Sequence, residues 1–159
     1  MSVMVLQELE ATYGHRDESL LEKIAEFERR QLTNEAYKSC VSEQALEALH
    51  HLPEAHSVHD KLRQIVLFLE KISEYFSSSP SNKKSSAIGA DSLLKMACQH
   101  IIMAKVYGIN AQIAFLEEFA RDEQLLRGRE GYALATFQAS LHFLNHSNNF
   151  EDDIFGSDA

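Results

Sequence analysis

The feature that most constrains the fold is the spacing of apolar residues between positions 58 and 76. They recur every three or four residues, at Leu62, Ile65, Val66, Leu69, Ile72 and Phe76. This is the spacing of an amphipathic α-helix that buries one face. Ser57, with Asp60 three residues later, resembles a capping box and predicts where the helix begins. The segment therefore predicts a helix packed against other elements.

Further segments carry helical patterns of the same kind. They are residues 17–31, 42–52, 91–106, 109–119 and 131–146. The composition agrees, because six Gly, two Pro and few alternating Val and Thr residues do not favour a sheet. We therefore expect an all-α protein, folded as a compact multi-helix bundle.

The chain of 159 residues is most simply one domain with short flanking segments. Residues 1–41 are expected to form a short N-terminal helical segment, and residues 42–146 the helical domain. Within that domain, residues 77–90 (SSSPSNKKSSAIGA) predict a flexible polar loop. Residues 147–159 are acidic with isolated aromatic side chains, which predicts a disordered tail.

Charge and hydropathy exclude several classes of function. The formal net charge of -9 argues against binding nucleic acid and favours a partner with a basic face. No apolar stretch is long enough for a membrane span, and the N-terminus carries Glu8 and Glu10 without the basic start of a signal peptide. Cys40 and Cys98 lie in helical patterns, which indicates reduced thiols in a cytoplasmic protein.

Asp91 stands at the start of an apolar segment, directly after Gly89 and Ala90. A carboxylate there can cap the helix, because it accepts from backbone N–H groups and suits the positive end of the helix dipole. On a helical wheel, however, a polar strip lies beside the apolar cluster of Leu93, Leu94, Ala97, Ile101 and Ala104. The strip consists of Asp91, Lys95 and Gln99. Capping and an outward-facing functional role both stay open.

Tyr132 is the second candidate. The expected buried stripe of its helix is Leu134, Phe137, Leu141 and Leu144. Tyr132 lies on nearly the opposite side, among small side chains at Ala135, Thr136, Ala139 and Ser140. A tyrosine in a helix is usually a core residue, but an aromatic ring surrounded by small side chains also suits a docking surface.

The histidines do not predict a metal site. His50, His51, His56 and His59 fall within ten residues, but no Cys lies among them and Pro53 interrupts the run. We expect solvated histidines and no bound metal. The sequence also lacks the motifs GxSxG, GxxxxGK[ST], GxGxxG and HExxH, so it gives no support for a hydrolase, a nucleotide-binding enzyme or a metalloprotease.

Two motifs together give the chain a family resemblance. The stretch Gly89-Ala90-Asp91-Ser92-Leu93-Leu94 resembles the G-A-D-x-L-L pattern of the Vps-nine (vacuolar protein sorting nine) domain. The stretch 128–143 resembles the family's later motif, which is G-E-x-G-Y followed by a helix with Leu, Gln-Ala and an aromatic residue; here these are Gly131, Tyr132, Leu134, Gln138, Ala139 and Phe143. The segments 57–72 and 109–119 resemble the family's helices upstream of and between the motifs. The likeness covers roughly residues 42–145.

The resemblance implies a function and a set of site residues. Vps-nine domains are guanine-nucleotide exchange factors for the Rab-five group of small GTPases in endosomal trafficking. It implies Asp91 and Tyr132 as the catalytic residues, Asp91 displacing the bound nucleotide and Tyr132 packing against the GTPase switch region. It implies a partner surface of Leu94, Lys95, Ala135, Thr136 and Ala139. Neither a cofactor nor covalent chemistry is implied, and a cytoplasmic protein recruited to endosomal membranes would fit.

The sequence departs from the family pattern at two of these positions. Lys95 stands where the family usually has proline, and Ala135 where it usually has threonine. Two alternatives therefore accompany the exchange factor: a divergent Rab-binding adaptor without exchange activity, and a helical scaffold in which Asp91 caps and Tyr132 packs.

Overall fold

The computed structural model describes residues 2–30, 41–77, 89–121 and 123–155. Within these ranges the chain forms helices and no strand: α1 (Ser2–Arg30), α2 (Glu43–His51), α3 (Val58–Ser77), α4 (Ala90–Ala104), α5 (Ile109–Phe119), η2 (Leu125–Arg127), α6 (Arg129–His146) and α7 (Phe150–Asp153). The prediction of an all-α bundle is confirmed. Most of the predicted loop and Cys40 lie outside the described residues.

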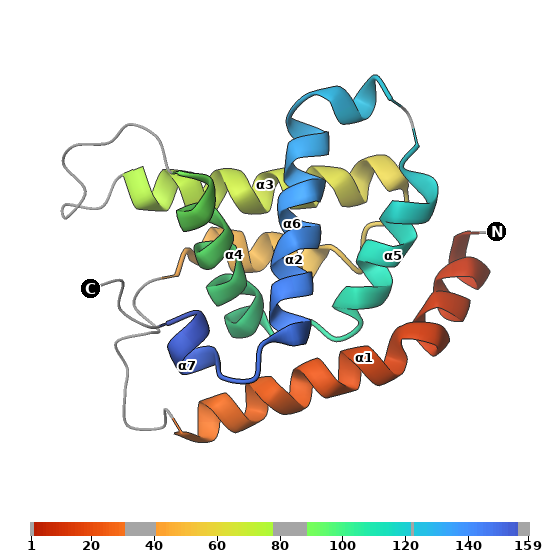
Figure 1. Cartoon of the computed structure of the whole chain (residues 1–159). Helices are drawn as coiled ribbons and strands as arrows, with labels where there is room; N and C mark the ends of the chain where they lie inside the picture. The colour runs from red at the N-terminus through yellow and green to blue at the C-terminus, as the bar shows by residue number, and fades with distance from the viewer. Residues whose placement is uncertain (1, 31–40, 78–88, 122, 156–159) are drawn as a thin grey trace.

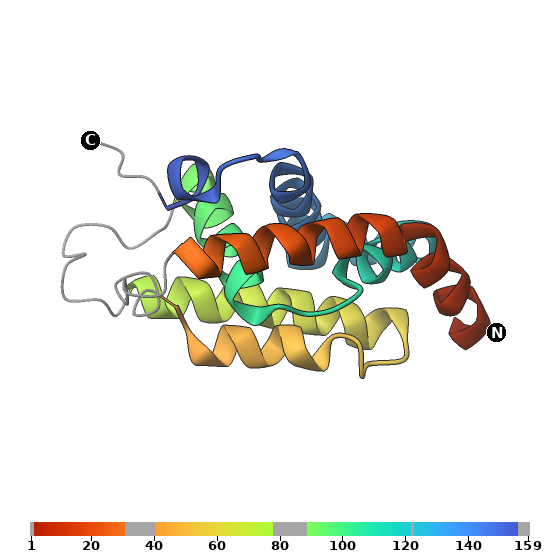
Figure 2. The same cartoon turned by 90° about the horizontal axis from the view of Figure 1, so that it is seen from below.

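Helices α3, α4 and α6 build the centre of the bundle. Helix α6 packs against both α3 and α4 (Figure 1), and α2 covers the other side of α3 (Figure 2). The predicted stripe of α3 is buried from Leu62 to Ile72. The rings of Phe68 and Phe137 meet edge to face, with their centroids 5.5 Å apart. Burial of these apolar faces supplies most of the stabilisation of the fold.

Helix α1 is longer than the sequence predicts and runs along one edge of the bundle (Figures 1 and 2). Two of its charged side chains bind the ends of other helices. The buried Asp17 carboxylate accepts from the backbone N–H and the side-chain amide of Asn110, in the first turn of α5, at 2.8 and 2.9 Å. Lys23 Nζ donates to carbonyls at the end of α6, those of Leu144, Asn145 and Ser147. An acid at a helix N-terminus and a base at a C-terminus are both favourable, so α1 is held by charge as well as by packing.

The prediction of disorder is wrong for the part of the tail that the structure describes. Asn149 caps α7 by accepting from the N–H of Asp152 at 3.3 Å. Phe150 and Ile154 are buried, and Phe155 stacks on Phe27 of α1 at 4.8 Å. The acidic composition suggested a solvated tail, whereas three apolar side chains at i, i+4 and i+5 fix it to the bundle.

A buried histidine fixes the position of α4. His100 accepts from the N–H of Ser42 at 2.8 Å and donates to the carbonyl of Met96 at 2.7 Å. Ser42 is also the N-cap of α2. Because burial lowers the pKa of His100, this side chain stays neutral and joins α4 to the start of α2. The outward strip of α4 is thereby held in one orientation.

Candidate functional site

Asp91 lies in the first turn of α4, and its side chain is exposed. The N-cap is Gly89, so the interpretation of Asp91 as the cap is wrong. In the described part of the chain, no hydrogen bond or ion pair involves the Asp91 carboxylate. A carboxylate here is favoured by the helix dipole and is open to an external group.

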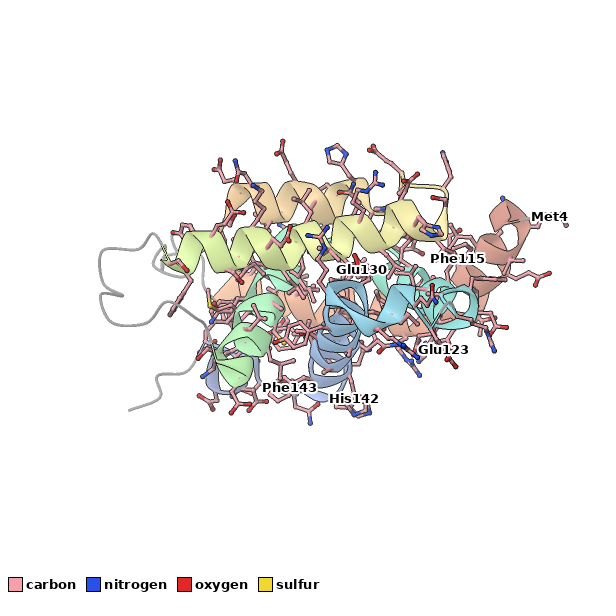
Figure 3. The ribbon with its side chains drawn as sticks, turned by 90° about the horizontal axis from the view of Figure 1, so that it is seen from above. Met4, Phe115, Glu123, Glu130, His142 and Phe143 are labelled. Atoms are coloured by element: carbon pink, nitrogen blue, oxygen red, sulfur yellow. The ribbon has the colours of Figure 1, made fainter. Side chains whose placement is uncertain are left out.

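A hollow of about 340 Å³ adjoins Asp91. Helix α4 lines it with Asp91, Ser92, Leu94, Lys95 and Cys98; the opposite side is formed by Phe143, Asp153 and Ile154. We call this the Asp91 hollow. Its walls combine charged groups at the rim with apolar side chains, and Phe143 is 40% exposed. Figure 3 shows Phe143 on the side of α6 that faces α4.

Tyr132 is 54% exposed, so the interpretation of a core tyrosine is wrong. It lines a different hollow, of about 470 Å³, between α3, α4 and the start of α6. This Tyr132 hollow has an apolar floor that includes Leu69 and Leu93 and a rim of charged side chains that includes Glu70 and Arg129. The structure places Asp91 and Tyr132, which the family resemblance assigns to one partner, at two hollows that meet α4 at the neighbouring residues Leu93 and Leu94.

The start of α6 is held against the preceding turn by a close backbone contact. A Cβ atom at Gly131 would lie 1.8 Å from the carbonyl oxygen of Leu126, so no other residue fits without a shift of the backbone. Arg129 also pairs with Glu70 of α3, at 3.1 Å. This pair is exposed and contributes little to stability, but the glycine contact fixes the turn from which Tyr132 projects.

The remaining predicted contact residues are exposed or half-buried, and only two of them line a hollow. Leu94 and Lys95 are half-buried and line the Asp91 hollow. Ala135 and Ala139 are exposed and Thr136 is half-buried; they lie on α6 between Tyr132 and Phe143 and line neither hollow. Ser140 was expected beside Tyr132 but is buried, with its hydroxyl donating to the carbonyl of Thr136 at 2.8 Å.

Five residues of the Asp91 hollow were not predicted as site residues: Ser92 and Cys98 of α4, and Phe143, Asp153 and Ile154 on the opposite side. Phe143 carried a motif signal, as the aromatic residue that follows Gln138 and Ala139. Asp153 and Ile154 fell in the tail that was predicted to be disordered. The apolar spacing of Phe150, Ile154 and Phe155 was the signal that could have found them.

The sequence was also compared with known proteins. The family model of the vacuolar sorting protein 9 (VPS9) domain matches residues 42–149, which are 108 of the 159 residues. The chain belongs to the VPS9 domain family. The matched span includes α2 to α6, and therefore Asp91, Tyr132 and both hollows except for the α7 side chains. Neither the curated proteins nor the solved structures contained a match.

Membership of the VPS9 family implies a general function in guanine-nucleotide exchange on Rab-type small GTPases. Such a partner is a protein, and both hollows lie on open surface that a protein could reach. Among the described residues, no helix is both long and apolar enough to cross a bilayer.

The Cys98 thiol and the side chains of His50 and His51 bond to other groups of the chain. Cys98 donates to the carbonyl of Ser140 at 3.5 Å, and burial raises the pKa of its thiol to about 12, so it is unreactive near neutral pH. His50 bonds to the carbonyl of Ala104, and His51 pairs with Glu54 at the surface. Among the described residues, no group of three or more His, Cys, Asp or Glu side chains is placed to hold a metal ion.

Proposed function

We propose that this chain promotes GDP release from a small GTPase of the Rab-five group. The observation that carries the proposal is the Asp91 carboxylate, which is exposed and has no partner among the described residues, at the edge of an apolar hollow in a VPS9 domain. Endosomal membranes are the proposed place of action, because GTPases of that group act there.

The proposed mechanism is electrostatic and needs no covalent step. A small GTPase holds its nucleotide through Mg²⁺ and the lysine of its phosphate-binding loop. A carboxylate that enters this site can pair with the lysine and repel the phosphates, which weakens the hold on GDP. Asp91 suits this role because α4 is rigidly held and the carboxylate has no internal bond to break first.

The surrounding residues would bind the protein surface of the GTPase. In this proposal Tyr132 packs its exposed ring against the switch region, while Leu94 offers an apolar contact between the two hollows. Exposed aromatic side chains over an apolar floor are typical of residues that dominate a protein interface. Ala135, Thr136 and Ala139 extend the contact along α6.

A second candidate is a Rab-binding adaptor without exchange activity. Lys95 favours it, because this residue lines the same hollow as Asp91 and its positive charge would compete with the lysine of the GTPase. Binding of a nucleotide-free GTPase without faster GDP release would support the adaptor.

The test is fluorescent GDP release from a panel of Rab GTPases, with and without the chain. Asp91→Asn keeps the shape of the side chain and removes its charge, and it should abolish acceleration. Asp60→Asn is the matched control, since Asp60 is an exposed aspartate in the first turn of α3 and lines neither hollow. Equal exchange rates with the wild type and with Asp91→Asn would contradict the mechanism. If the chain accelerated GDP release from none of the Rab GTPases, the proposed function would be contradicted.

A further inference from the structure

The Asp91 hollow has a wall that the family match does not include. The match ends at residue 149, whereas Asp153 and Ile154 lie beyond it and line the hollow opposite Asp91 and Lys95. Figures 1 and 2 show α7 beside α4 in both views. This wall is therefore a feature of the present chain that membership of the family does not explain.

Contacts with two other helices hold this wall in place. Gln99 of α4 donates its amide to the carbonyl of Ile154 at 3.1 Å, and the side chain of Ile154 is 1% exposed. On the other side, Phe27 of α1 meets the rings of Phe150 and Phe155 at 6.1 and 4.8 Å. Both apolar ends of the segment are anchored, so the residue between them has a defined position.

Asp153 is the charged residue of this wall. Its carboxylate is exposed and accepts from the hydroxyl of Ser147 at 2.7 Å, which orients the side chain. The second carboxylate oxygen stays available for another donor. The two carboxylates of Asp91 and Asp153 stand on opposite sides of an apolar floor and outnumber the ammonium group of Lys95, so the hollow suits an apolar segment that carries a basic side chain.

We propose that α7 is a third element of the GTPase-binding surface, and that Asp153 selects partners by pairing with a basic side chain at the edge of the switch region. This inference rests on the proposed function, because it takes the occupant of the Asp91 hollow to be the GTPase. The overall charge of -9 supports the same choice of a basic partner surface.

The experiment measures KM and kcat for exchange on a GDP-loaded GTPase of the Rab-five group. Asp153→Lys should raise KM about tenfold with kcat nearly unchanged, because a charge at the rim affects encounter and binding more than release of the nucleotide. Asp153→Asn can still accept from Ser147 and should raise KM less. The effect of Asp153→Lys should shrink as salt is raised, since the charges are exposed.

Asp152→Lys is the matched control. Asp152 lies on the same short helix and is exposed, but it does not line the hollow, and its substitution changes the net charge by the same amount. Equal KM values for Asp153→Lys and Asp152→Lys would overturn the inference, as would a fall in kcat alone.

The outcomes separate this inference from the proposed function. Exchange by the wild type that Asp91→Asn abolishes, together with no specific effect of Asp153→Lys, would leave the function standing and refute the role of α7. A wild-type chain that neither binds nor accelerates any Rab would refute both. Melting curves of all variants exclude loss of fold as the cause of a changed KM.

Discussion

The buried Lys61 predicts an unusual dependence of stability on alkaline pH. Its side chain is 1% exposed, and its ammonium group donates to the carbonyl of Leu52 and the side-chain oxygen of Gln112. Burial lowers the pKa of Lys61 from 10.5 to about 8, although the charge of Glu10 acts in the opposite direction. This lower pKa corresponds to a cost of at most about 3.5 kcal/mol in the free energy of unfolding below pH 8.

The sign follows from proton uptake. Below pH 8 Lys61 carries its proton in both states, and the folded state bears the full cost of the buried charge. Between pH 8 and 10.5 the unfolded state binds more protons, so the free energy of unfolding rises, by at most about 1.4 kcal/mol for each pH unit. Lys23, whose pKa burial also lowers, acts in the same direction.

Cys98 opposes this rise at higher pH. Burial raises the pKa of its thiol from 9.0 to about 12, so above pH 9 the unfolded state loses this proton first and stability falls. The contributions of Lys61 and Cys98 to the change of the free energy of unfolding with pH have the same size and opposite sign. We therefore expect stability to rise between pH 8 and 9, to stay nearly level to pH 10.5, and to fall beyond it.

Urea unfolding at pH 7, 8, 9 and 10, followed by circular dichroism, measures this profile. Lys61→Met should remove most of the rise between pH 8 and 9, and Cys98→Ala should extend the rise above pH 9. Lys61→Met also leaves two buried acceptors without a donor, which lowers the free energy of unfolding at every pH. The variants are therefore compared by how the free energy of unfolding changes with pH, and not by its absolute value. A wild-type profile that is flat from pH 8 to 9 and equal to that of Lys61→Met would refute the reasoning.

Four further predictions concern the site and its supports. Gly131→Ala should destabilise the fold by about 2 kcal/mol and weaken GTPase binding, because the added Cβ meets the Leu126 carbonyl. Urea unfolding and a binding titration measure the two effects, and a variant as stable as the wild type would contradict the prediction. Lys95→Ala should raise the exchange rate about twofold by removing a competing charge from the Asp91 hollow; slower exchange would make Lys95 a productive contact. Lys23→Met should cost about 2 kcal/mol, since three carbonyls at the end of α6 lose their donor, and an unchanged urea midpoint would refute it. His100 binds a proton more readily in the unfolded state, so stability should fall as pH drops below 6.5; an equal fall in His100→Gln would show another cause.

The sequence predicted the helices well because each needs only local information. The bounds of α5 agree with the prediction at both ends, and those of α2, α3, α4 and α6 agree within a few residues at most. Periodic burial explains this success, since Leu62, Ile65 and Leu134 are buried as their spacing requires. The family resemblance also came from local motifs, and the match over residues 42–149 confirmed it.

Position on a helical wheel was a weaker guide to the site. It placed Asp91 and Tyr132 outside the apolar stripes, and both side chains are exposed. It could not show that they adjoin separate hollows, because that depends on how α4 crosses α6 and on what α3 and α7 add beside them. The prediction for Ser140 was wrong for the same reason. Ser140 lies off the apolar stripe of its own helix, yet it is buried against α4, where its carbonyl accepts from Cys98.

The sequence by itself determined the helical class, the apolar stripes and the family, because spacing and motif are properties of adjacent residues. Only the tertiary structure decided which charges are buried and which surfaces are open. Asp17, Lys23 and Lys61 read as ordinary charged helix residues, but each meets a polar group from a distant part of the chain. The segment from Phe150 to Phe155 is folded because Phe27, more than a hundred residues earlier, supplies the surface on which its aromatic side chains pack.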